Sequence, residues 1–147
     1  MVLDDYLNSL KGKSIAVVGY GVSNAPLVDL LLSHGLNVTI CDKRGVAQFE
    51  NAKILMERGA RLRLGDKYLE ELHEDIIFRT PGLHPFTSQL QNAVNNGSVL
   101  TSEMEAFFSV CPCRTIAVTG SDGKTTTSTL IATLLRESGH TVFLGGN

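Results

Sequence analysis

Short apolar segments alternate with longer amphipathic segments along the first 110 residues of this 147-residue chain. Buried strands of a parallel sheet are predicted by five apolar runs, at residues 14–19, 38–41, 61–64, 75–79 and 98–100. Helices are predicted from Ser23, the expected capping residue, to His34, and over residues 46–58, 86–95 and 103–108. Strands that alternate with helices indicate an α/β domain with a parallel sheet and right-handed crossovers.

The pattern changes after residue 110, where Cys111-Pro112-Cys113-Arg114 indicates a junction. Beyond it we predict a strand at residues 115–118, a helix at 128–137 and a strand at 141–144. We therefore expect two domains, residues 1–110 and residues 111–147. Because a single βαβ unit cannot bury both of its faces, we expect the second to pack against the first domain or, in a dimer, against another copy.

A Gly-rich turn, Gly120-Ser121-Asp122-Gly123-Lys124-Thr125, lies between the predicted strand at 115–118 and the helix that follows. Main-chain N–H groups of such a turn, together with a helix N-terminus, favour phosphate. Lys124 would reach the β- and γ-phosphates, and the Thr125 hydroxyl would bind Mg²⁺. The pattern is short, and the alternative is an ordinary strand-to-helix turn that uses Gly for positive φ.

A second Gly-rich turn, Gly19-Tyr20-Gly21, follows the first predicted strand, and Asp42 ends the second strand. This arrangement is typical of dinucleotide-binding folds, but Asn24 stands where the third Gly of that fingerprint belongs. NAD is therefore disfavoured. Ligands of open parallel sheets bind outside the carboxyl ends of the strands, where we expect a pocket from residues 22–23, 42–43, 80–82 and 101–103.

Composition narrows the function classes further. The net charge is −2 and the basic residues are scattered, which argues against nucleic-acid binding. No apolar run approaches the roughly 20 residues of a membrane span, and the N-terminus lacks the pattern of a signal peptide. Three cysteines form no evident disulfide framework, so we expect a cytoplasmic protein.

Taken in order, these motifs resemble the start of a Mur ligase. They are most similar to the members of that family that join D-glutamate to UDP-N-acetylmuramoyl-L-alanine in peptidoglycan synthesis. The matching segments are residues 19–23, 42–44, 80–83, 101–105, 120–125 and 145–147. The resemblance implies a Rossmann-like parallel sheet that binds the UDP-sugar, followed by the truncated start of a P-loop ATPase domain. Asp122 departs from the family, which commonly has Asn there, and adds a negative charge beside the ATP phosphates.

The resemblance also implies roles for individual residues. Gly21, Val22, Ser23, Asp42, Lys43, Thr80, Gly82 and Asn147 would bind the UDP-substrate. Gly120, Ser121, Asp122, Gly123, Lys124, Thr125 and Thr126 would bind ATP, with Lys124 and Thr125 in the catalytic role and Thr125 on Mg²⁺. The family reaction passes through an acyl phosphate of the substrate, which the amine of D-glutamate then attacks.

The isolated chain is expected to be inactive, because the family places further metal ligands and the D-glutamate-binding domain downstream. Two other functions remain open from the sequence. One is a non-catalytic nucleotide-binding module, and the other is an NAD(P)-binding domain of an oxidoreductase.

Overall fold

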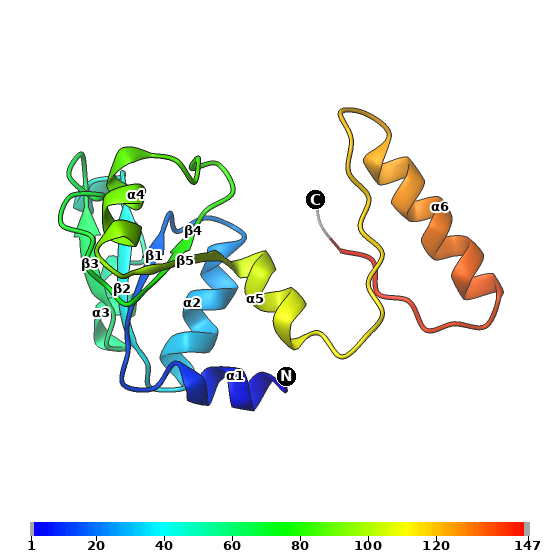
Figure 1. Cartoon of the computed structure of the whole chain (residues 1–147), viewed down its shortest axis with the longest axis horizontal. Coiled ribbons are helices and arrows are strands. Elements are labelled where there is room, and N and C mark those ends of the chain that lie inside the picture. Colours follow the sequence, from blue (N-terminus) through cyan, green and yellow to red (C-terminus); the bar gives the residue numbers. More distant parts are fainter. Residues whose placement is uncertain (1, 146–147) are drawn as a thin grey trace. The chain divides into compact units, whose positions relative to one another are not determined.

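The computed structural model describes residues 2–145, which fall into two compact units on either side of the bond between Pro112 and Cys113. The first unit contains all five strands of the structure as described and five of its α-helices (Figure 1). Its elements are α1 (Leu3–Ser9), β1 (Ser14–Val18), α2 (Asn24–Ser33), β2 (Asn37–Asp42), the 3₁₀ helix η1 (Val46–Gln48), α3 (Ala52–Glu57), β3 (Arg61–Leu64), β4 (Ile76–Arg79), α4 (Ser88–Asn95), β5 (Val99–Ser102) and α5 (Glu103–Val110).

The five strands form one parallel sheet in the order β3-β2-β1-β4-β5, with β1 at its centre. This confirms the predicted α/β class and all five predicted strands. The register aligns Val18 at the end of β1 with Cys41 on β2 and with Arg79 on β4. The loops that follow these three strands therefore emerge at the same edge of the sheet.

Alternating residues of the central strand supply two separate cores. Ile15 and Val17 face a core that includes buried side chains of α1, α2, α3 and α5, whereas Ala16 and Val18 face a smaller core that includes α4. Figure 1 shows α2 and α4 on either side of the sheet. Burial on both faces explains why the central strands are continuous apolar runs rather than alternating ones.

Three local predictions differ from the structure. The helix predicted over residues 46–58 is divided into η1 and α3, because Phe49 leaves the helical conformation (φ −102°, ψ 83°) and is buried in the first core. Ser23 makes no capping hydrogen bond, since its own backbone is helical and its side chain is exposed. The short helix α1 was not predicted, although its Leu7 is buried in the first core.

The second unit contains α6 (Lys124–Glu137), which confirms the predicted helix and begins four residues earlier than expected. The prediction of strands at residues 115–118 and 141–144 is wrong, because neither segment is part of a sheet in the structure. A strand requires a neighbouring strand to pair its main-chain groups, and within residues 113–145 none forms. No helix within residues 2–145 has the combined length and apolarity needed to cross a bilayer.

Candidate functional site

A pocket of about 390 Å³ lies where the loops after β1, β2 and β4 meet, at the carboxyl edge of the sheet. Open parallel sheets bind their ligands at this edge. Of the residues predicted to bind the UDP-substrate, the structure brings together Gly21, Asp42, Lys43, Thr80 and Gly82. The remaining lining residues are Val18, Gly19, Tyr20, Arg44, Tyr68 and Leu83.

Gly19 allows the first turn to approach the loop after β4. Its φ is +85°, and its N–H donates to the main-chain oxygen of Cys41 at 2.7 Å. A Cβ at Gly19 would lie 2.9 Å from Cγ2 of Thr80, closer than side chains tolerate. The turn therefore requires glycine both for its backbone conformation and for the space that Thr80 occupies.

Asn24 stands where the dinucleotide fingerprint has its third glycine, and its side chain bonds the main chain of the same turn. Its side-chain amide donates to the main-chain oxygens of Val18 (3.3 Å) and Gly19 (2.8 Å), and the residue is only 1% exposed. Its Oδ1 is buried and makes no hydrogen bond within the described part of the chain. Asn24 thus stabilises the turn structurally, in the position where dinucleotide-binding folds place a glycine.

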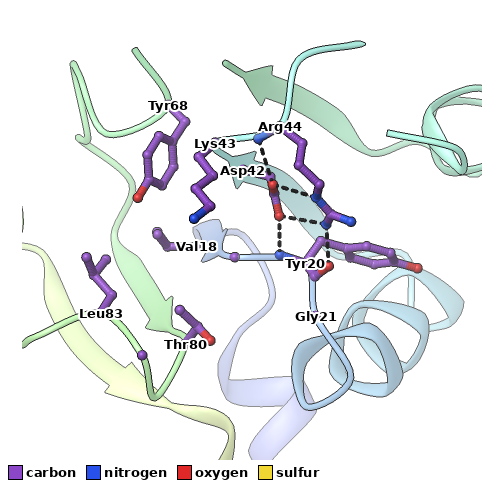
Figure 2. A pocket seen from close by; sticks show the side chains of 11 residues that line it. Val18, Tyr20, Gly21, Asp42, Lys43, Arg44, Tyr68, Thr80 and Leu83 are labelled. Carbon is purple, nitrogen blue, oxygen red and sulfur yellow. Dashed lines mark hydrogen bonds and ion pairs between the residues drawn. The ribbon is translucent and has the colours of Figure 1, made fainter. Parts of the chain in front are cut away.

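Asp42 and Arg44 form an ion pair at the end of β2, and both bond the main chain of Tyr20 in the loop after β1 (Figure 2). One carboxylate oxygen of Asp42 accepts from the Arg44 main chain (2.9 Å) and from Nε (2.8 Å). The other accepts from the Tyr20 main chain and from Arg44 Nη2, both at 2.8 Å. Burial raises the pKa of Asp42, but these hydrogen bonds outweigh burial and hold its pKa below the ordinary value.

Arg44 is a site residue that the sequence reasoning did not assign. Its Nη2 also donates to the main-chain oxygen of Tyr20 at 2.6 Å, and its guanidinium lies 5.0 Å from the centre of the Phe49 ring. The sequence did contain a signal for Arg44. This residue lies two residues after Asp42, and oppositely charged side chains at that spacing in one turn can form an ion pair. The side chain is 42% exposed, so it borders the pocket rather than filling it.

Lys43 and Thr80 extend polar groups toward the pocket, as Figure 2 shows. Neither side chain makes a hydrogen bond or ion pair to another residue among those described, so both are available to a ligand. Tyr68, from the connection between β3 and β4, also lines the pocket and was missed because nothing near it in the sequence suggests a site. Val18 and Leu83 provide apolar surface between these polar groups.

A second hollow of about 450 Å³ continues from the first and shares Tyr20, Gly21 and Arg44 with it. Val22 lines this second hollow at the start of α2 and is 94% exposed. Ser23 lines neither hollow, although it is exposed at the N-terminus of the same helix. The structure therefore places two of the predicted residues, Val22 and Ser23, beside the pocket rather than within it.

The predicted ATP loop forms its own turn in the second unit. Gly120 and Gly123 both have positive φ (+153° and +73°), and α6 begins at Lys124. The Lys124 amine donates to the main-chain oxygens of Gly120 (2.6 Å) and Ser121 (3.1 Å). The lysine thus folds back over the loop at a helix N-terminus.

The rest of the predicted ATP site, Asp122, Thr125 and Thr126, is on this loop or in the first turn of α6, and its binding role stays a prediction. Within residues 2–145, no three His, Cys, Asp or Glu side chains come together as a preformed metal site. Asn147, predicted to contact the UDP-substrate, lies outside the described residues.

Comparison with known proteins finds relatives that are named as ligases. No protein-family model matches it. It is 47% identical over 147 residues to the UDP-N-acetylmuramoylalanine--D-glutamate ligase of Ruminiclostridium cellulolyticum, covering 99% of this chain and 32% of that protein. The ligases of the same name from Clostridium kluyveri and Acetivibrio thermocellus are 44% and 41% identical, over 98% and 99% of this chain and 32% of each relative. The chain therefore spans about a third of the length of these relatives.

Among solved structures, shikimate dehydrogenases are similar at low identity. The enzyme from Mycobacterium fortuitum gives a TM-score of 0.43 at 16% identity, over 67% of this chain and 47% of that one. The enzyme from Aquifex aeolicus gives 0.44 at 19%, over 78% and 54%. The sequence relatives carry the assignment: the chain is homologous, along almost all of its length, to the N-terminal third of the UDP-N-acetylmuramoylalanine--D-glutamate ligases, as its Mur ligase motifs predicted.

Proposed function

We propose that the first unit binds the UDP part of UDP-N-acetylmuramoylalanine, as the substrate-binding part of an ATP-dependent ligase that adds D-glutamate. The observation that supports this most is the pocket at the carboxyl edge of the sheet, in a chain homologous to ligases named for a UDP-linked substrate. The uracil would occupy the pocket near Lys43 and Thr80. The diphosphate would lie at the N-terminus of α2, beside Gly21, Val22 and Ser23.

The charges of the pocket suit an anionic ligand. The carboxylate of Asp42 is neutralised by the guanidinium of Arg44, whereas the ammonium of Lys43 has no acidic partner among the described residues. The pocket therefore carries a net positive charge. An ammonium group only donates hydrogen bonds, so Lys43 matches the carbonyl oxygens of uracil rather than the amino group of cytosine.

The state of Asp42 argues against the alternative of an NAD(P)-binding domain. In dinucleotide-binding folds the acidic residue after the second strand accepts hydrogen bonds from a ribose hydroxyl. Here each oxygen of Asp42 already accepts two hydrogen bonds, all from Tyr20 and Arg44. A ribose would have to displace one of them, and the side chain of Asn24 occupies the place of the third glycine.

The loop at residues 120–126 fits the proposed ATP site. The positive φ of Gly123, the start of α6 at Lys124 and the reach of the Lys124 amine across the loop are features that a triphosphate site requires. Bound ATP with Mg²⁺ would supply the phosphoryl group that activates the substrate carboxylate. Lys124 would place its positive charge beside the phosphates, and Thr125 would offer its hydroxyl to the metal. The carboxylate of Asp122 opposes phosphate binding at the same loop.

Isothermal titration calorimetry of the 147-residue chain tests the UDP site. We expect heat with UDP and none with NADH. Lys43→Met should weaken UDP binding about tenfold, the effect of losing one hydrogen bond from a charged donor. Lys11→Met, which removes an exposed ammonium outside the pocket, is the matched control. Heat with NADH and none with UDP would overturn the proposal. The D-glutamate step and the cytoplasmic location stay predictions for the whole ligase, and a dimer through the second unit stays a prediction for this chain.

A further inference from the structure

Tyr68 is one of the pocket residues that the sequence reasoning did not assign, and it comes from a segment remote from both Gly-rich turns. It lies in the connection between β3 and β4 and lines the pocket beside Lys43 and Leu83. Figure 2 shows its ring on the side of the pocket away from Arg44, with Lys43 between them. Within residues 2–145 its hydroxyl makes no hydrogen bond, so a ligand can use it as donor or acceptor.

The ring of Tyr68 packs on its side away from the pocket. It packs against the second core of the sheet together with the partly buried side chains of Leu69, Leu83 and Leu100. Packing of this kind limits the orientations that an aromatic ring can adopt. The side of the pocket that it forms is therefore largely preformed.

The main chain on the N-terminal side of Tyr68 is tied directly to the Asp42–Arg44 loop. The N–H of Gly65, which has φ +89°, lies 3.0 Å from the main-chain oxygen of Asp42 and 3.1 Å from that of Arg44. The N–H of Tyr68 in turn donates to the oxygen of Gly65 at 3.0 Å. These main-chain hydrogen bonds thus join the two loops and restrain the separation of Tyr68 from Lys43.

The C-terminal side of the same connection is anchored by a buried ion pair. Glu74 is 3% exposed, and one of its carboxylate oxygens lies 2.9 Å from Nη2 of Arg63 on β3. Its other oxygen accepts from the main-chain N–H of His73 at 3.1 Å. With both ends held, the connection resists displacement by a larger ligand.

We propose that Tyr68 is a specificity-determining residue of the base pocket, an inference that rests on the proposed UDP site. Its fixed ring limits the depth of the pocket to a single-ring base, and its hydroxyl hydrogen-bonds an edge of that base. Lys43 and Thr80 then complete the polar surroundings of the base from the opposite loops. A two-ring base entering the same pocket has to displace Tyr68 from the core behind it.

Calorimetric titration with UDP and with ADP tests this, in the 147-residue chain carrying Lys124→Met so that the proposed ATP loop loses its phosphate-binding ammonium. We expect this parent chain, with Tyr68 unchanged, to bind UDP at least about tenfold more tightly than ADP, the scale on which a pocket rejects an oversized group. Tyr68→Ala should reduce that preference to about threefold or less, because the space behind the base opens. Tyr68→Phe should keep the preference but weaken UDP binding about threefold to tenfold, through loss of one neutral hydrogen bond.

Tyr6→Phe, which removes the hydroxyl of a half-buried tyrosine on α1, is the matched control and should leave both affinities unchanged. Circular dichroism establishes that each variant is folded, and Tyr68→Phe keeps the test valid if the alanine variant is not. UDP binding with an unchanged UDP-to-ADP ratio in Tyr68→Ala, or an unchanged UDP affinity in Tyr68→Phe, refutes the role of Tyr68 alone. Absence of UDP binding to the unmodified chain overturns the proposed function as well.

Discussion

The carboxylate of Asp42 should contribute more to stability than any other single group at the pocket, and its removal tests how the two loops are joined. Asp42→Ala deletes the acceptor of two main-chain N–H groups and of the Arg44 guanidinium. A hydrogen bond to a charged group is worth about 1.5–3 kcal/mol. The ion pair adds at most about 1 kcal/mol, because the Arg44 side chain is 42% exposed.

Water can reach the half-exposed donors after the carboxylate is removed, so the lower end of the range applies to each main-chain bond. The sum is a loss of about 3–4 kcal/mol in the free energy of unfolding for Asp42→Ala. Asp42→Asn keeps one acceptor oxygen and should lose about half as much. Asp66→Asn, at an exposed site in the next loop, should change stability by less than about 0.5 kcal/mol and serves as the control.

Urea unfolding followed by far-ultraviolet circular dichroism measures these differences, since the chain has no Trp for fluorescence. Because the pKa of Asp42 is lowered on folding, its contribution is fully present above the unfolded pKa of about 3.9 and is lost as pH falls through the lower folded value. The difference between the unmodified chain and Asp42→Asn should therefore shrink below about pH 4. A loss under about 1 kcal/mol for Asp42→Ala, or a difference that does not depend on pH, would refute this account of the loops.

Three other changes test separate parts of the fold. Gly19→Ala should lower the free energy of unfolding, measured by thermal denaturation, by about 2–4 kcal/mol, because of its positive φ and the contact with Thr80. Gly12→Ala, which has positive φ but open space around its Cβ, should lower it by about 1–2 kcal/mol, and equal losses would exclude the contact. Burial raises the pKa of the Cys41 thiol to about 12, so mass spectrometry should find Cys41 unalkylated at neutral pH until urea unfolds the chain, and alkylation of the folded chain would contradict this. Glu74→Ala should lower the free energy of unfolding by about 3–5 kcal/mol, because it leaves the partly buried guanidinium of Arg63 without its partner. A change near zero in urea unfolding would show that water already solvates the ion pair.

The strands and most helices of the first unit could be predicted from the sequence because their information is local. Runs such as residues 15–18 and 76–78 are apolar on both faces, and glycines such as Gly35 and Gly59, both with positive φ, end the helices before β2 and β3. Local patterns fail at Phe49, whose burial interrupts an apparent helix. They also fail at residues 115–118 and 141–144, whose apolar runs have no strand to pair with in the part of the chain that the structure describes.

The sequence by itself therefore determined a parallel α/β sheet, two glycine-rich turns and the residues that begin the loops after each strand. Only the tertiary structure decided which of those loops share a pocket, because the strand order places β1 between β2 and β4 and aligns Val18 with Cys41 and Arg79. It also brought in Arg44 and Tyr68, whose positions depend on an ion pair and on main-chain hydrogen bonds between loops. Contacts between residues distant in the chain leave no periodic signal in the sequence, and they are what gives this pocket its charge and its shape.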